Sequence, residues 1–137
     1  MKAKGIGYWT TTTLIALETL AGGIADLTHG RTMLVSGPPV LEVITQLGYP
    51  AYLLTILGIW KLLGGVTLLV PRFPRLKEWA YAGIFFELTG AAASQAARAN
   101  WSEIIAPLIL AALTITSWAL RPPTRTLTKD NAGLTIR

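Results

Sequence analysis

Long apolar runs dominate the pattern of hydrophobic and polar positions along this chain. Four of them cover about 8–27, 51–70, 79–97 and 104–120. A helix rises about 1.5 Å per residue, so about 20 residues match the roughly 30 Å hydrocarbon core of a bilayer. Helices in a soluble core keep a polar face at helical spacing, and these runs have almost none. We therefore predict an all-α protein, a bundle of four transmembrane helices within residues 1–122.

The link between the first two runs contains a shorter pattern. Apolar side chains recur there at helical spacing, at Val40, Leu41, Val43, Ile44 and Leu47. This predicts a short amphipathic helix in the first outer loop, lying flat against the mouth of the bundle. Residues 123–137 form a polar stretch without apolar periodicity, which we expect to be a disordered cytoplasmic tail.

Basic residues are distributed unevenly between the two sides of the predicted bundle. The links opposite the termini hold only Arg31 and Arg98. The other side holds nine, namely Lys2, Lys4, Arg72, Arg75, Lys77, Arg121, Arg125, Lys129 and Arg137. By the positive-inside rule, both termini are predicted to lie in the cytoplasm. Because these charges flank apolar runs, the pI near 9.9 does not indicate nucleic-acid binding.

Composition narrows the chemistry of any site. The 137 residues include no cysteine and a single histidine. Disulfides, cysteine-ligated zinc, iron–sulfur clusters and multi-histidine metal centres are therefore excluded, and we expect no metal site. No nucleophile–base pair stands out either. We recognise no self-contained catalytic constellation, so a redox cofactor would have to come from a partner protein.

An ionisable residue lies at the middle of each of the first three runs. These residues are Glu18, Lys61 and Glu87. Each costs roughly 2.5–3.5 kcal/mol at the centre of a bilayer on insertion scales. Small residues follow each charge three or four positions later, on the same helix face, where they let backbones approach. We therefore expect one inward-facing midplane cluster, in which Lys61 bridges at least one carboxylate.

Further polar residues lie near the outer ends of the first and third runs. They are Asp26, His29, Ser94, Gln95 and Asn100. With the termini inside, all five fall on the extracytoplasmic side. They are expected to form a polar vestibule between the outer surface and the midplane cluster, although a lone histidine at a membrane interface is usually only solvated.

Two classes of function are compatible with the cluster. In the first, it binds the headgroup of a quinone or another small amphipathic molecule, as a ligand-binding subunit of a membrane redox system. In the second, the protein is non-catalytic and the cluster only organises the bundle, since buried ion pairs can specify an arrangement without adding much stability. An ion or solute pathway fits less well, because four helices alone rarely enclose one. The small-residue faces would also permit a homodimer.

Several short motifs carry a family resemblance. They are Gly48-Tyr49-Pro50, Lys61-Leu62-Leu63-Gly64-Gly65, Pro71, the stretch 80–87 ending in Glu87, and the stretch 117–122. Over roughly residues 8–122, the chain resembles the DoxX-like family of small bacterial integral membrane proteins.

The resemblance implies a four-helix, multi-pass protein of the bacterial cytoplasmic (inner) membrane. The best-known relatives are associated with quinone-linked sulfur oxidation and with membrane oxidoreductase complexes. A quinone is therefore the implied ligand, and oxidoreductase subunits are the implied partners. Many members carry a histidine after the serine late in the third span, where this chain has Gln95. That departure argues against a histidine-dependent redox role.

Overall fold

The computed structural model describes residues 2–31 and 37–127, and within them every regular element is helical. The long helices are α1 (Lys2–Thr28), α3 (Tyr52–Leu69), α4 (Pro74–Ala97) and α5 (Ile105–Ala119). A short helix, α2 (Val40–Leu47), lies between α1 and α3. Two 3₁₀-helices, η1 (Trp101–Ile104) and η2 (Pro123–Arg125), flank α5. The all-α prediction is confirmed.

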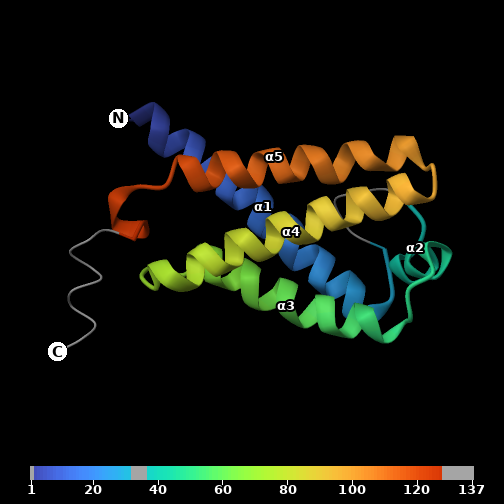
Figure 1. The fold of residues 1–137 in the computed structure, drawn as a ribbon. Helices are drawn as coiled ribbons and strands as arrows, with labels where there is room; N and C mark the ends of the chain where they lie inside the picture. Colours follow the sequence, from blue (N-terminus) through green and yellow to red (C-terminus); the bar gives the residue numbers. More distant parts are fainter. Residues whose placement is uncertain (1, 32–36, 128–137) are drawn as a thin grey trace.

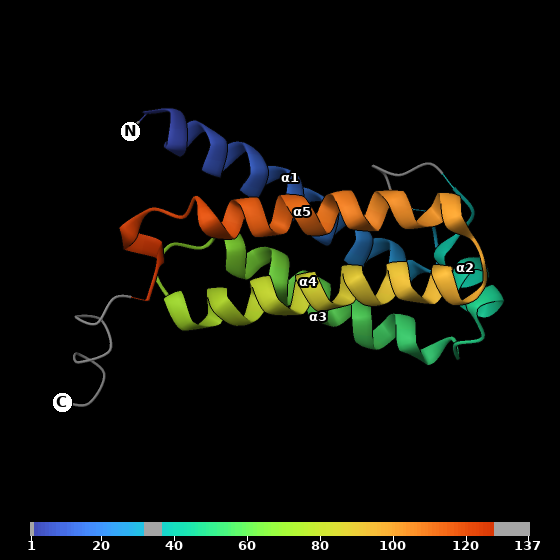
Figure 2. The same cartoon turned by 45° about the horizontal axis from the view of Figure 1, so that its top comes forward.

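The four long helices pack side by side and alternate in direction (Figure 1). The beginning of α1 and the end of α5 lie at one end of the bundle, and α2 lies at the opposite end (Figures 1 and 2). The most extensive packing is between α1 and α3, followed by α4 against α5. Short links explain the reversals after α3 and after α4, because a few residues can join only neighbouring, antiparallel helices. Between α1 and α3 the chain instead passes through the longer segment that contains α2.

The helix boundaries agree with the predicted runs, with two extensions. The first helix begins at Lys2 and not at 8, and α4 begins at Pro74 and not at 79. A proline suits the first turn of a helix, where its missing N–H would have no partner. The short helix predicted over 40–47 is observed with those bounds as α2. Pro107 lies in the first turn of α5, where a proline does not interrupt the helical hydrogen bonds and so does not kink the helix.

Within the described residues, two helical stretches are long and apolar enough by themselves to cross a membrane. They are Tyr52–Leu69 and Trp101–Ala119. Their outer faces expose large apolar side chains, including Trp60 at 67% and Ile105 at 60%. Soluble monomers rarely expose many large apolar side chains next to one another, whereas the hydrocarbon of a bilayer solvates them. The two helices therefore have the character of membrane spans.

Glycines let α1 and α3 approach closely. A Cβ atom added at Gly58 would lie 2.7 Å from Leu27 and 3.0 Å from the carbonyl oxygen of Gly23. A Cβ atom added at Gly65 would also lie 2.7 Å from a leucine of α1. Gly90 in α4 differs, since nothing lies within 4 Å of its added Cβ. The small residues that follow the midplane charges therefore form a helix contact in α1 and α3, but Gly90 does not.

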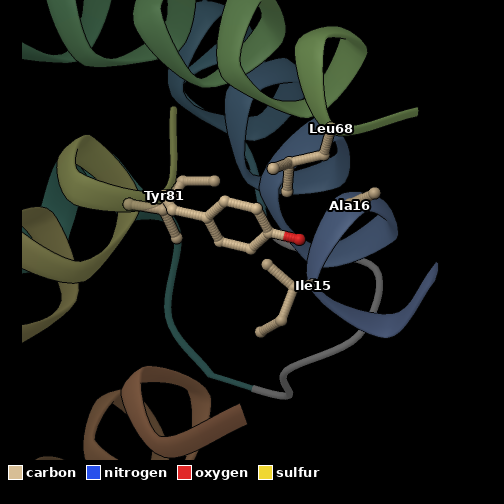
Figure 3. Packing of buried hydrophobic residues seen from close by; sticks show 5 residues of the cluster. Ile15, Ala16, Leu68 and Tyr81 are labelled. Atoms are coloured by element: carbon tan, nitrogen blue, oxygen red, sulfur yellow. The ribbon is translucent and has the colours of Figure 1, made fainter. Parts of the chain in front are cut away.

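The apolar core lies between α1, α3 and α4. It consists of Ile15, Ala16, Leu68, Tyr81 and Ile84. Figure 3 shows the ring of Tyr81 pointing from α4 toward Ile15 and Ala16 of α1. The hydroxyl groups of Tyr81 and Ser117 share a hydrogen bond of 2.8 Å, and Ser117 shares another of 2.6 Å with Thr12. The polar tip of the tyrosine is therefore satisfied inside the core.

Two cations cap the C-terminal end of α3. The ammonium of Lys77 donates to the carbonyl oxygens of Thr67, Leu68 and Val70. The guanidinium of Arg125 donates to the carbonyl of Leu68 at 3.0 Å. The last carbonyls of a helix lack intrahelical partners and carry partial negative charge, so cations stabilise them. Both residues are buried and do not simply mark the solvated side of the bundle.

The expectation of a disordered tail from residue 123 is wrong for its first residues. Residues 123–125 form η2, and Arg125 is 9% exposed. Its Nη1 also donates to the hydroxyl of Tyr8 at 3.3 Å, and its guanidinium lies 4.7 Å from the ring centre of Trp9. The local sequence is polar, but the carbonyls and aromatic rings that hold Arg125 come from distant helices. The rest of the expected tail, 128–137, lies outside the described residues.

Candidate functional site

Lys61 of α3 forms the centre of a polar site between three helices. Its Nζ lies 2.7 Å from Oδ2 of Asp26 on α1 and 2.8 Å from Oε1 of Glu87 on α4. The side chain of Asp26 is 3% exposed, that of Lys61 19% and that of Glu87 27%. Such charge-assisted contacts are stronger than neutral hydrogen bonds, and here one ammonium links α1, α3 and α4.

Lys61 pairs with Glu87 as expected, but its second partner is Asp26 and not Glu18, which lines the cavity beside Lys61 and Glu87. The ion pairs join Lys61 to Asp26 and Glu87, so Asp26 belongs to the ion-paired group and not to the outer vestibule. The sequence alone does not decide which carboxylate of α1 pairs with Lys61. Gly22, which lies beside Lys61, is one helical turn from both Glu18 and Asp26. A Cβ atom added at Gly22 would be 3.5 Å from the Nζ of Lys61. The ammonium therefore lies over a glycine midway between two carboxylates, and packing directs it to the outer one.

A cavity of about 520 Å³ opens beside the ion pairs. Its charged part is lined by Glu18, Lys61 and Glu87. Its apolar wall comes mainly from α2, α4 and α5, and includes Val43, Leu47, Leu88, Ala91, Ala106 and Leu110. This volume lies within the range of about 300–1,000 Å³ that is usual for small-molecule sites, which are mostly apolar with few polar groups. The arrangement can therefore hold an apolar chain with a polar headgroup at the charged part.

The expected vestibule is formed only in part by the residues assigned to it. Gln95 and Asn100 line the cavity, and the amide nitrogen of Asn100 donates to Oε1 of Gln95 at 3.0 Å. Ser94 instead shares a 2.8 Å hydrogen bond with the hydroxyl of Tyr49. His29 is exposed and lines a different hollow, against α2. Two of the five residues thus line the cavity, while Asp26 pairs with Lys61.

Three polar residues at the cavity were not singled out from the sequence. They are Gln46, Ser102 and Glu103, which line it from α2 and η1. Gln46 could have been found, because it belongs to the polar side of the predicted amphipathic helix. The other two lie in a short polar link, where nothing in the local pattern indicates which way a side chain faces.

Backbone contacts hold α2 beside the cavity. Arg98 at the end of α4 donates from Nη2 to the carbonyl of Leu47 at 3.2 Å. The N–H of Val40 donates to the carbonyl of Gly30 at 2.8 Å. Gly48 ends the helix in the left-handed conformation, with φ at 87°, which glycine adopts without steric cost. These contacts hold α2 so that Val40, Val43, Gln46 and Leu47 line the cavity.

A second ion pair lies toward the end of the bundle that holds the beginning of α1. Nη1 of Arg121 lies 2.7 Å from Oε1 of Glu78, and Nε1 of Trp118 donates to Oε2 of Glu78 at 2.8 Å. Burial by itself would raise the pKa of Glu78. The hydrogen bonds from Trp118 and Arg121 together lower it by more, so the pKa lies below its ordinary value. This pair joins the start of α4 to the end of α5. Within residues 2–31 and 37–127, no group of three His, Cys, Asp or Glu residues could hold a metal ion.

The comparisons with known proteins agree with the resemblance seen in the sequence motifs. The sequence profile described as the DoxX-like family matches residues 10–117, which is most of the chain. Comparison with curated proteins and comparison with solved structures gave no match. The three ion-paired residues and Glu18 all lie in the matched region. Family and apolar helices together indicate a membrane protein. The chain belongs to the DoxX-like family.

Proposed function

We propose that this protein is a multi-pass protein of the bacterial inner membrane, crossed by α1, α3, α4 and η1–α5, with both termini in the cytoplasm. The lengths support this, since α1 has 27 residues and α4 has 24, and about 20 suffice to span. The excess of Lys and Arg at the end where α1 begins supports the orientation.

The charges in α1 and α4 are compatible with crossing a membrane because they meet inside the bundle. Asp26 and Glu87 both contact Lys61, and the cavity that Glu18 lines has charged and polar groups along it. Ionisable residues in membrane spans usually face the bundle interior or a water-filled cavity and mark functional sites. The lower hydropathy of these two helices therefore does not argue against spanning.

The function we propose for the cavity is the binding of a small amphipathic molecule. The observation that carries it is the continuity of the 520 Å³ cavity from Lys61 and Glu87 to α2 and η1. An apolar chain would lie against Leu88 and Leu110, where it replaces water on an apolar wall. The headgroup would lie at the charged part.

A quinone headgroup is compatible with this cavity. Its carbonyl oxygens accept hydrogen bonds, which the ammonium of Lys61 or the amides of Gln95 and Asn100 could donate. A quinol hydroxyl could donate to Glu18. Electrons would then pass to or from a membrane oxidoreductase subunit. This is the role that the family resemblance implies.

A structural or assembly role is the second candidate, and one observation favours it. A single ammonium contacts carboxylates from two other helices, so Lys61 specifies how α1, α3 and α4 meet. Polar contacts of this kind link helices in membranes, where apolar burial alone does not drive helix association. In this role the cavity would be filled by lipid or water and would have no specific ligand.

Thermal unfolding of the purified protein in detergent separates the two roles. The probes are a decyl-substituted benzoquinone, octylamine, octanol and octanoate. A ligand that binds the native state raises the midpoint of unfolding. Ala91→Phe fills the cavity, and Ala93→Phe is its matched control, because Ala93 is exposed on α4 and does not line the cavity.

Stabilisation by at least one probe in the wild type and the control, but not in Ala91→Phe, would support ligand binding. If no probe shifts the midpoint, or if both variants respond like the wild type, the binding role is wrong and the structural role remains.

A further inference from the structure

We infer that the cavity selects a positively charged headgroup, so that its ligand class is a small amphipathic amine. The inference rests on the proposed binding function and adds the chemistry of the ligand. It is carried by the charges that line or contact the cavity, by which of them are already paired, and by the apolar wall beside them.

The charges at the inner part of the cavity do not balance. Lys61 is the one basic residue among the described residues that line the cavity. It contacts Asp26 and Glu87, while Glu18 lines the same cavity and makes no ion pair within residues 2–31 and 37–127. Two carboxyl groups therefore share the one ammonium, and Glu18 is a third carboxyl group beside them. When all three are ionised, the site has one net negative charge, which a second cation would neutralise.

Glu18 is placed to receive that cation. It is partly buried, and it lines both the large cavity and a small void of about 40 Å³ that Glu87 and Lys61 also line. Lys61 contacts Glu87 through Oε1, which leaves the second carboxylate oxygen for another donor. An alkylammonium group has three N–H donors, enough to reach Glu18 and Glu87 together.

The same charges disfavour other headgroups. A carboxylate headgroup would meet Glu18 and Glu87, and like charges in a poorly solvated site repel strongly. A neutral headgroup would have to compete with two carboxylates for the N–H groups of Lys61. Glu103 also lines the cavity, from η1, and adds negative charge that attracts cations to it.

The test compares three probes that share one eight-carbon chain: octylamine, octanol and octanoate. Thermal unfolding of the purified full chain is measured in a neutral detergent at pH 7, at equal probe concentrations. We expect octylamine to raise the unfolding midpoint by several degrees more than octanol, and octanoate to have the smallest effect. Glu18→Gln should remove the advantage of octylamine over octanol.

Glu42→Gln is the matched control, because Glu42 is an exposed carboxylate of α2 that does not line the cavity. It should keep the full preference for octylamine. If Glu18→Gln does not fold, the order of the three probes on the wild type still decides the question.

Two failures are distinguishable. If octanol or the decyl benzoquinone stabilises the protein as well as octylamine does, the amine inference is wrong while the proposed binding function stands. An octylamine effect of equal size in Glu18→Gln would also overturn the inference. If no probe stabilises the wild type, both the inference and the binding function are wrong.

Discussion

The Nζ of Lys61 lies 2.7 Å from Oδ2 of Asp26, two helical turns beyond Glu18 on α1. This contact links the middle of α3 to the C-terminal end of α1. It leaves Glu18 beside the cavity without an ion pair among the described residues. The two carboxylates of α1 therefore have different roles, the outer one in packing and the inner one in the cavity.

Replacing the two carboxylates by their amides should separate those roles. Asp26→Asn removes one partner of a buried ion pair, a change that costs up to about 3–5 kcal/mol. Glu18→Gln removes no ion pair seen in the structure and should cost about 1 kcal/mol or less. Thermal unfolding in detergent measures both. Equal destabilisation by the two variants would contradict the assignment of Asp26 as the structural partner.

Gly58→Ala should destabilise the contact between α1 and α3. Its added Cβ would lie 2.7 Å from Leu27 and 3.0 Å from a backbone oxygen, and overpacking of this kind costs about 1–3 kcal/mol. Gly90→Ala is the matched control, because it also lies within a helix but nothing lies within 4 Å of its added Cβ. A control that loses as much stability as Gly58→Ala would show that close approach is not the cause.

The pair between Glu78 and Arg121 should make stability depend on pH below neutrality. Glu78 lies near the start of α4, before the apolar run 79–97 that we take as the membrane-spanning part of this helix, and its pKa in the folded protein lies below the ordinary 4.5. The folded state therefore binds fewer protons than the unfolded state in this range. Its contribution is complete above about pH 4.5 and is lost as pH falls through the lower folded pKa.

The corresponding measurement is the unfolding midpoint of Glu78→Gln and wild type across pH 3–7. The wild type should be more stable near pH 6, by about 1 kcal/mol or less because the pair is partly exposed, and this difference should disappear at acid pH. Glu42→Gln, which removes a carboxylate without an arginine partner in the described residues, should show no such trend. A difference that grew at low pH would have the wrong sign.

Arg125→Gln should loosen the segment after α5. The change removes the guanidinium donors to the carbonyl groups of Leu68 and Leu69. The carbonyl of Leu68 keeps its hydrogen bond from Lys77, so the loss falls mainly on the carbonyl of Leu69 and should cost about 1 kcal/mol. Faster proteolysis near residue 125 and a lower unfolding midpoint are expected. Arg75→Gln is the control, since Arg75 is exposed on the first turn of α4. An unchanged midpoint in Arg125→Gln would show that this arginine does not stabilise the end of α3.

Reporter fusions test the proposed orientation. Fusions after Arg125 and within 72–77 should report the cytoplasm, and a fusion within 37–48 should report the outside. The reason is that most Lys and Arg residues lie on the side that holds the two termini and the 72–77 link. A reporter on the outside after Arg125 would contradict either the count of four spans or the orientation.

The sequence by itself determined the helices. Apolar runs of about 20 residues, and the amphipathic pattern over 40–47, predicted elements that the structure has with small changes at their ends. This works because helix formation depends on local periodicity and on breakers such as Gly37-Pro38-Pro39. The family could likewise be recognised from local motifs, and the profile match confirms it.

Only the tertiary structure decided which groups meet. In the structure, the ammonium of Lys61 on α3 lies beside Gly22 on α1. Glu18 and Asp26 are each one helical turn from Gly22, in opposite directions. A lysine side chain is long enough to reach either carboxylate, so residue counting cannot choose between them. The close crossing of α1 and α3 at Gly23 and Gly58, with Glu87 approaching from α4, directs the ammonium to Asp26. The buried position of Arg125 was decided in the same way, because its acceptors belong to a helix more than 50 residues away in the chain.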